Sequence, residues 1–265
     1  MRGEKENTMY ACITGATSGI GKALANVLAK EGYHLLLTGR NLNHLKDLQI
    51  MLEKTYNVKV HTKRLDVTSL EDMDALIAYI QEHNILIDLF VNNAGVGFFG
   101  EFQSIDIEDD LISIDTNIRG VTYLTKKVYP YIRQHGTMLQ VASTAAFAPG
   151  PYMAVYYASK AYVLSLSMAL RNEWKEKGIY VSTLCPGPTK TPFIQKAGMQ
   201  KSGLAKFTAM TPEKVAQIAY KGIKKHKAII IPGFTNKLSA WIMSLCPIGL
   251  STLLVRSTQK NENEK

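Results

Sequence analysis

The sequence predicts a single-domain α/β protein with a doubly wound parallel sheet of about seven strands and helices on both faces. Short β-branched or aliphatic runs alternate with longer amphipathic runs, as in repeated βαβ units. Several of the short runs are apolar on both alternating sets of positions, as expected for strands that are buried on both faces. The chain of 265 residues, 46% of them apolar and 20% charged, is long enough for one such unit.

Each expected strand is a short apolar run. In order these runs are MYACIT near Met9, HLLLTG near His34, VKVHTKRL near Val58, ILIDLFVNN near Ile85, TMLQVAS near Thr137, IYVSTLCPG near Ile179 and AIIIPG near Ala228. Helical patterns such as GKALANVLAKEG and EKVAQIAYKGIKKH lie between them, with apolar residues at three- and four-residue steps. In such sheets ligands bind beyond the carboxyl ends of the strands, so functional residues are expected there.

Charge and cysteine content exclude several classes of function. The formal net charge is +9, but the lysines and arginines are spread along the chain, so a nucleic-acid partner is not predicted. Cys12, Cys185 and Cys246 are far apart and odd in number, which argues against a disulfide framework and against a metal site. These cysteines fit a reducing cytoplasm, and the N-terminus MRGEKENT lacks the apolar core of a secretory signal peptide.

A glycine-rich turn, TGATSGIG, follows the first expected strand and runs directly into a helix. Its glycines allow a phosphate to approach the backbone N–H groups at the helix N-terminus closely. The alternative is an ordinary turn, but the strand before it and the helix after it favour phosphate binding. The cofactor-binding residues expected here are Gly15, Thr17, Ser18, Gly19, Ile20 and Gly21.

The turn has the spacing TGxxxGxG, and the motif NNAG follows later in the chain. With these motifs the chain resembles the short-chain dehydrogenase/reductases from about Tyr10 to Pro232. The resemblance implies a Rossmann-type fold that binds a nicotinamide dinucleotide, with the aspartate of the motif LDV facing the adenine amino group. The further cofactor contacts that it implies are Asp66, Val67, Asn93, Ala94 and Gly95.

The residue after the second expected strand bears on the type of cofactor. A carboxylate about 20 residues past the glycine turn would bond the ribose hydroxyls of NAD(H). This chain has Gly39 followed by Arg40, and a guanidinium suits the 2′-phosphate of NADP(H) through its fork of donors. NADP(H) is therefore predicted over NAD(H), although the family sometimes tolerates both. The alternative is that Arg40 is a solvated residue at the start of the next helix.

The stretch YYASK, Tyr156 to Lys160, sets two tyrosines against one lysine. In a helix both tyrosines share a face with Lys160, so geometry alone does not choose between Tyr156 and Tyr157. In the family a serine at the end of the fifth strand precedes the tyrosine of YxxxK, which aligns Ser143 with Tyr156. The resemblance thus implies Tyr156 as the proton donor and Tyr157 as a packing neighbour, turned about 100° around the helix.

The expected chemistry is hydride transfer to a carbonyl, for which the tyrosine must supply a proton near neutral pH. A lysine ammonium within about 6 Å, together with the positive nicotinamide, is expected to lower the pKa of the tyrosine. The resemblance implies that the lysine also bonds the nicotinamide ribose, that the serine holds the substrate oxygen, and that the asparagine of DTNIRG holds a water in a proton relay. Taken alone, that serine would more often be a strand-end cap and that asparagine part of a polar helix face. The expected catalytic residues are Asn117, Ser143, Tyr156 and Lys160, of which Tyr156 and Lys160 also contact the cofactor.

The motif CPGPTKT follows the sixth expected strand. The resemblance implies that the backbone of Pro186 and Gly187 lies near the nicotinamide. Thr189 and Thr191 are candidates to hydrogen-bond the carboxamide or the pyrophosphate, with Thr191 favoured. The alternative role for Thr191 is the N-cap of a following helix.

Three loops are expected at the substrate side, at residues 96–102, at 147–153 and in a lid near 189–210. They supply Phe, Met, Ala and Pro rather than a cluster of charges, which predicts a mostly apolar carbonyl or alcohol substrate. For any single phenylalanine in these loops, packing in the core is at least as good an explanation.

The predicted organisation is a flexible N-terminus (1–8), a catalytic domain (9–235), an apolar C-terminal segment (236–255) and a disordered tail (256–265). As one helix, the uncharged residues 238–255 would span about 27 Å, close to the thickness of a bilayer. The proline and glycine within this stretch argue against a simple span. A helical cover over the substrate cleft or a subunit contact is favoured, and an interfacial membrane contact and a transmembrane anchor stay open.

The predicted function is the NADP(H)-dependent interconversion of a carbonyl and an alcohol on a mostly apolar small-molecule substrate. The first alternative is a membrane-associated reductase of lipid or sterol-like ketones. The second is a nucleotide-sensing protein without catalysis, which would not need the catalytic residues that this chain retains. The resemblance also implies a homodimer or homotetramer, formed through the long helices that bear Asn117 and Tyr156.

Overall fold

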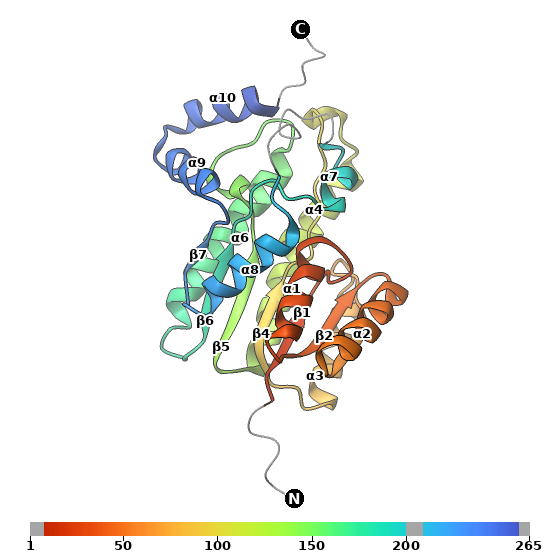
Figure 1. The fold of residues 1–265 in the computed structure, drawn as a ribbon. Coiled ribbons are helices and arrows are strands. Elements are labelled where there is room, and N and C mark those ends of the chain that lie inside the picture. The colour runs from red at the N-terminus through yellow and green to blue at the C-terminus, as the bar shows by residue number, and fades with distance from the viewer. Residues whose placement is uncertain (1–7, 200–208, 260–265) are drawn as a thin grey trace, which may run out of the picture.

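A seven-stranded parallel sheet forms the centre of the computed structural model, which describes residues 8–199 and 209–259 (Figure 1). The strands are β1 (Tyr10–Ile13), β2 (His34–Gly39), β3 (Val60–Arg64), β4 (Ile87–Asn92), β5 (Ile132–Val141), β6 (Tyr180–Leu184) and β7 (Ile229–Ile230). The α-helices are α1 (Gly19–Lys30), α2 (Leu42–Tyr56), α3 (Leu70–Glu82), α4 (Ile107–Ile114), α5 (Val121–Val128), α6 (Ala154–Glu173), α7 (Pro192–Lys196), α8 (Pro212–Ile223), α9 (Phe234–Leu245) and α10 (Ile248–Gln259). A π-helical turn, η2 (Asp115–Gly120), joins α4 to α5, and the 3-10 turns are η1 (Phe102–Ser104), η3 (Tyr129–Tyr131) and η4 (Thr144–Phe147).

The strand order is β3-β2-β1-β4-β5-β6-β7, and the strand pairs are parallel. The chain therefore builds the sheet outward from β1 to β3, returns to the centre, and builds outward again from β4 to β7. This is a doubly wound Rossmann-type sheet, so the predicted fold class is confirmed. The reversal between β1 and β4 places the turns that follow these two strands side by side.

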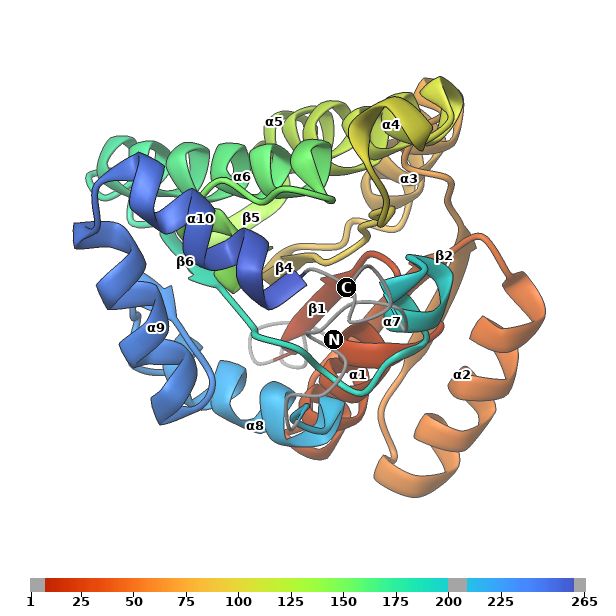
Figure 2. The same cartoon turned by 90° about the horizontal axis from the view of Figure 1, so that it is seen from above.

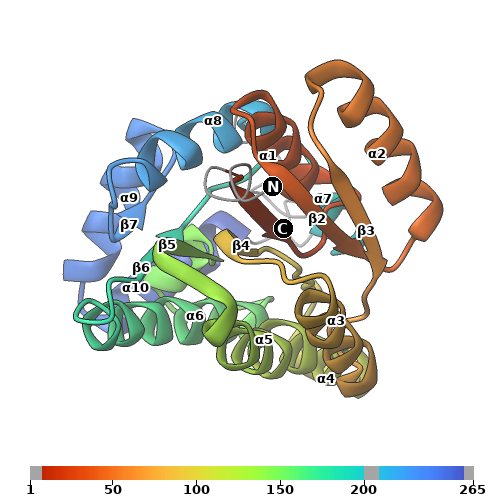
Figure 3. The same ribbon diagram turned by 90° about the horizontal axis from the view of Figure 1, so that it is seen from below.

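Helices cover both faces of the sheet, with α1, α2 and α8 on one side and α3, α5 and α6 on the other (Figures 2 and 3). Alternate residues of one strand therefore enter two different cores. In β1, Ile13 packs into the core beneath α1, whereas Cys12 joins the core that also contains Phe90 of β4. Both sets are buried, which explains why the strands read as continuous apolar runs rather than alternating ones.

From the sequence, residues 238–255 could form a single helix, but the structure differs. This segment forms two helices, α9 and α10, because Cys246 and Pro247 interrupt it. Cys246 is extended, as is usual before a proline, and Pro247 has no N–H to continue the helical hydrogen bonds. Among the helices of residues 8–199 and 209–259, none is long and apolar enough to span a bilayer.

The boundary of the C-terminal tail also changes. Because α10 continues to Gln259, residues 256–259 are helical rather than part of a disordered tail. Three predicted segments lie partly outside the described residues: the N-terminus at 1–7, the substrate lid at 200–208 and the tail at 260–265.

Candidate active site

A cavity of about 1360 Å³ lies at the carboxyl ends of the strands. It is larger than a usual small-ligand pocket of roughly 300–1,000 Å³, so it has room for a dinucleotide and a substrate together. Most of the predicted site residues line it: Gly15, Thr17, Ser18, Gly19, Ile20, Arg40, Asp66, Val67, Asn93, Ala94, Gly95, Ser143, Tyr156, Lys160, Pro186, Gly187, Thr189 and Thr191. Gly21 and Asn117 were predicted to take part but do not line the cavity.

The glycine turn has the backbone geometry that close approach of a phosphate requires. Gly15 and Gly19 have φ of +66° and +55°, in the left-handed region that favours glycine. Gly21 acts differently, because a Cβ there would overlap the carbonyl oxygen of Gly15. The absence of a side chain at Gly21 lets α1 pack against the turn, and a cofactor contact by its backbone stays a prediction. The turn and the helix N-terminus behind it fit a dinucleotide pyrophosphate.

The motif NNAG is bonded directly to the glycine turn. The hydroxyl of Thr14 accepts from the backbone N–H groups of Asn93 at 2.9 Å and of Ala94 at 3.0 Å. In return, the side-chain amide of Asn93 donates to the carbonyl oxygens of Thr14 at 2.9 Å and of Gly15 at 3.1 Å. Asn93 thus holds the turn in shape, a structural task that the sequence motif alone did not reveal.

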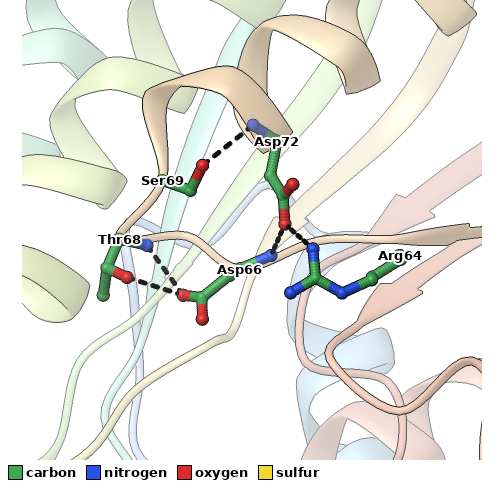
Figure 4. A network of polar contacts seen from close by, with 5 residues as sticks. All are labelled: Arg64, Asp66, Thr68, Ser69 and Asp72. Atoms are coloured by element: carbon green, nitrogen blue, oxygen red, sulfur yellow. Dashed lines mark hydrogen bonds and ion pairs between the residues drawn. The ribbon is translucent and has the colours of Figure 1, made fainter.

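Asp66 and exposed Arg40 lie at the end of the cavity where the adenosine is expected. The Asp66 carboxylate accepts from the N–H of Thr68 at 3.0 Å and from its hydroxyl at 2.8 Å (Figure 4). The N–H of Asp66 donates to Asp72, which also pairs with Arg64. Burial by itself raises the pKa of Asp66, but the bonds from Thr68 and the charge of Arg40 outweigh it and hold the pKa below its usual value.

Two further residues at this end were missed from the sequence. Asn41 and His44 line the cavity beside Arg40. Asn41 is the N-cap of α2, and its side chain accepts from the backbone N–H of His44 at 3.1 Å. An asparagine between a strand and an amphipathic run is a cap signal that could have located the start of this helix.

The proposed proton donor lies at the other end of the cavity, in the first turn of α6. This helix begins at Ala154, as expected, so Lys160 follows Tyr156 by one turn. The Nζ atom of Lys160 is 5.7 Å from the centre of the Tyr156 ring and donates to the carbonyl oxygen of Val141 at 3.1 Å. Gly97 is needed opposite the tyrosine, since a Cβ there would lie 2.7 Å from the ring atom Cδ2.

Among the chain's own groups, burial opposes the expected lowering of the Tyr156 pKa, and the lowering by lysine and nicotinamide together stays a prediction. Burial raises the pKa of Tyr156 to about 12, and the hydroxyl of Ser143 offsets only part of this rise. Burial also lowers the pKa of Lys160 to about 8. Both shifts have one cause: protein atoms replace the water that would solvate a phenolate or an ammonium. Tyr156 is therefore firmly protonated at neutral pH.

Asn117 lies behind the cavity wall, in the π-helical turn η2. Its side-chain amide donates to the carbonyl oxygen of Val96 at 2.8 Å and to the hydroxyl of Ser159 at 3.0 Å, and its oxygen accepts from the N–H of Val96 at 3.1 Å. A Cβ at Gly95 would lie 3.2 Å from the Lys160 ammonium and 3.3 Å from the Asn117 oxygen, so these two groups flank this glycine. The side chain of Asn117 is thus used within the protein, and the water relay stays a prediction.

The loop after β6 brings Thr191 to the glycine turn. A Cβ at Gly19 would lie 3.0 Å from Cγ2 of Thr191, so the two residues are in contact across the cavity. Thr191 also occupies the N-cap position of α7, but its side chain makes no capping hydrogen bond there. The hydroxyl of Thr189 instead donates to the carbonyl oxygen of Gly187 at 2.9 Å. Of the two threonines, Thr191 is therefore the better placed for a pyrophosphate.

The C-terminal helices α9 and α10 form one wall of the cavity. No sequence motif had indicated which of their residues would line it. The cavity-lining residues from α9 and α10 include Asn236, Ser239, Met243, Leu254, Val255 and Thr258. The apolar character of this segment was evident in the sequence and favoured either a cover over the substrate cleft or a subunit contact, and these positions lie where a cover would lie. Which of its residues face inward depends on how two helices pack on the rest of the chain.

Sequence comparison adds family information to this geometry. The family model described as short chain dehydrogenase matches residues 9–202. Sulfoacetaldehyde reductase 2 of Chromohalobacter salexigens is 34% identical over 213 residues, which are 78% of this chain and 84% of that protein. The very-long-chain 3-oxoacyl-CoA reductase of Anas platyrhynchos is 31% identical over 260 residues, which are 95% of this chain and 80% of that protein.

Solved structures agree on the fold, and several of them contain a nicotinamide dinucleotide. A short-chain dehydrogenase from Sphingobium yanoikuyae in complex with NADPH has a TM-score of 0.79 and 28% identity, covering 90% of this chain and 96% of its own. A 3-ketoacyl-(acyl-carrier-protein) reductase from Brucella melitensis complexed with NADH has a TM-score of 0.73 and 25% identity, covering 84% and 96%. Structures similar to this chain thus include both cofactor types.

Proposed function

This chain belongs to the short-chain dehydrogenase/reductase family of oxidoreductases, and on that premise we propose that it interconverts a carbonyl and an alcohol with NADP(H), using Tyr156 as the proton donor. One observation carries the proposal. Tyr156, Lys160 and Ser143 line one end of a cavity whose other end is walled by the glycine turn and Arg40. A hydride carrier bound along this cavity would bring its reactive end to the tyrosine.

NADPH, when bound, supplies the hydride, and the backbone of the glycine turn and Arg40 would hold its phosphates. The hydroxyl of Ser143 would donate to the substrate carbonyl oxygen and share the negative charge that develops there. The Oη atom of Tyr156 would then give its proton to that oxygen. The raised pKa of Tyr156 keeps this proton in place until the oxygen becomes basic. The Lys160 ammonium, held by the carbonyl of Val141, would stabilise the phenolate left behind.

The apolar cavity residues near Tyr156 favour an apolar substrate. Phe98, Phe193 and Met243 line the cavity, and the Phe193 ring lies 5.5 Å from the Tyr156 ring, centre to centre. The decisive experiment is a panel of aliphatic and aromatic ketones and aldehydes, followed by the loss of NADPH absorbance. We expect turnover of apolar members and little turnover of carboxylate-bearing ones. NADPH binding with no turnover of any member would instead favour the nucleotide-sensing alternative.

Arg40→Ala tests the preference for NADP(H). We expect the KM for NADPH to rise roughly tenfold or more, because charge-assisted hydrogen bonds to the 2′-phosphate are lost, while the KM for NADH changes less than about threefold. Lys46→Ala is the control, since it removes an exposed positive charge from the helix that follows Arg40 without touching the cavity. Equal effects of Arg40→Ala on the KM for NADPH and for NADH would mean that other residues bind the 2′-phosphate.

The second candidate function is a membrane-associated reductase of lipid-like ketones, and the outer surface of α9 and α10 favours it. Phe234, Trp241 and Ile248 are 79%, 62% and 74% exposed, and the chain from Lys214 to Gln259 contains no acidic residue. Exposed aromatic and aliphatic side chains without negative charge suit the interface of an anionic bilayer. The resemblance to a reductase named for very-long-chain acyl-CoA points the same way.

Vesicle flotation separates this candidate from the first. The purified protein should float with vesicles of phosphatidylcholine and phosphatidylglycerol, and Trp241→Ser combined with Ile248→Ser should abolish flotation, because both changes remove exposed apolar area. Ile50→Ser is a matched control, since Ile50 is 65% exposed on α2, away from these helices. A wild-type protein that stays at the bottom of the gradient would exclude the membrane-associated candidate.

A further inference from the structure

The second tyrosine of YYASK is tied to the end of α10. The Oη atom of Tyr157 accepts from the side-chain amide of Gln259 at 2.6 Å, across 102 residues of sequence. Gln259 is fully buried, which is uncommon for a glutamine, although it ends the last described helix. Ser251 and Val255 precede it at four-residue steps and are also buried. One face of α10, ending at this hydrogen bond, therefore packs on the protein.

The opposite face of α10 is exposed, so it makes few contacts that could hold the helix against the rest of the protein. Leu250 and Leu253 are 51% and 61% exposed. The burial of α10 is thus restricted to one narrow face, and side-chain hydrogen bonds such as that of Ser251 to the carbonyl of Ile248 stay within the helix. The bond between Gln259 and Tyr157 instead joins α10 to another part of the fold, so it should strongly influence whether this helix stays docked.

Tyr157 is itself held rigidly beside the proposed proton donor. Its ring packs on Gly150, where a Cβ would overlap the ring, and its N–H donates to the carbonyl of Met153 at 3.0 Å. The Tyr157 and Tyr156 rings make an edge-to-face contact, with 6.2 Å between their centres. A tyrosine fixed in this way is a firm attachment point for a helix that packs by one narrow face.

The docked helix walls the substrate end of the cavity. Leu254, Val255 and Thr258 of α10 line the same cavity as Tyr156 and Tyr157. We propose that the Gln259–Tyr157 hydrogen bond is a latch that positions α10 as a specificity-determining wall, against which the apolar part of a long substrate packs. Gln259 and Tyr157 are positioning residues in this scheme. The kinetic part rests on the proposed function, whereas the latch itself does not.

Hydrogen exchange tests the latch without any substrate. In Tyr157→Phe and in Gln259→Leu, amide exchange of residues 248–259 should accelerate roughly fivefold, the range expected for loss of one buried hydrogen bond. The double variant should exchange no faster than either single one, because both remove the same bond. Tyr162→Phe is the matched control: Tyr162 is on the same helix, but its hydroxyl shares a hydrogen bond of 2.7 Å with Thr122 of α5 instead of with α10. Unchanged exchange in both single variants, or additive effects in the double variant, would overturn the latch.

Kinetics test the wall. With 2-decanone and 2-butanone as probes, both single variants should raise the KM for 2-decanone about fivefold more than the KM for 2-butanone, while Tyr162→Phe leaves the ratio unchanged. Faster exchange of α10 with an unchanged KM ratio would overturn the role in specificity. A wild-type enzyme that reduces no ketone of any length would contradict the proposed function and the role in specificity, and the exchange data would still decide the latch.

Discussion

Replacing Tyr156 with phenylalanine is expected to lower kcat for carbonyl reduction by about 10²–10⁴, the usual contribution of a general acid. The variant keeps the ring and its contacts with Phe193 but has no proton to give to the substrate oxygen. The affinity for NADPH should stay within about threefold, since the phenol makes only a small part of the cofactor site. Stopped-flow measurement of NADPH oxidation, with a binding titration, separates the two effects.

Tyr157→Phe is the matched control for this experiment. The two tyrosines are adjacent on α6, both line the cavity, and burial raises the pKa of both. Tyr157→Phe should nevertheless retain most of kcat with a short ketone, because the Tyr157 hydroxyl is bonded to Gln259 rather than lying beside Ser143. A larger loss of kcat in Tyr157→Phe than in Tyr156→Phe would reverse the assignment.

Lys160→Met should also reduce kcat by about 10² or more, yet make the folded protein more stable at pH 7 without cofactor. The lysine is 4% exposed, and burial lowers its pKa from 10.5 to about 8. Holding the charged form inside the protein therefore costs about 3 kcal/mol. Methionine removes this cost but leaves the Val141 carbonyl without its donor, which costs about 1–2 kcal/mol. The free energy of unfolding should rise by the difference, about 1–2 kcal/mol.

The gain in the free energy of unfolding of Lys160→Met should become smaller as the pH rises. At pH 7 Lys160 is charged in both states, so folding bears the full cost of burying the charge. As the pH rises from about 8 toward 10.5, the folded protein loses this proton before the unfolded chain does, and the cost disappears. Urea unfolding at pH 7 and at pH 10 should thus show a gain in stability that shrinks or reverses. Lys22→Met, at an exposed position of α1, should show no comparable gain. A Lys160→Met variant that is less stable than the wild type at pH 7 would contradict this account.

Several features followed from the sequence because they depend on short stretches of chain. The run HLLLTG coincides with β2, and α6 begins at Ala154, so Tyr156 falls in its first turn. The apolar pattern of a strand and the spacing of a glycine turn are set by neighbouring residues. The family resemblance extended this to residues that are farther apart in the chain, since the order of its motifs aligned Ser143 with Tyr156.

Other features depend on how distant segments meet. Gly21 belongs to the glycine motif, but only the structure shows that a side chain there would overlap the carbonyl oxygen of Gly15. The direction of the Tyr156 pKa could not be read from the spacing to Lys160, because desolvation by the surrounding protein outweighs the attraction that this spacing suggested.

The sequence by itself determined the doubly wound sheet, the family and the chemical groups at the two ends of the site. Only the tertiary structure decided that α9 and α10 wall the cavity and that Gln259 bonds to Tyr157. The physical reason is that strand patterns and turns are local, whereas burial, pKa values and long-range hydrogen bonds depend on every segment that excludes water from a side chain.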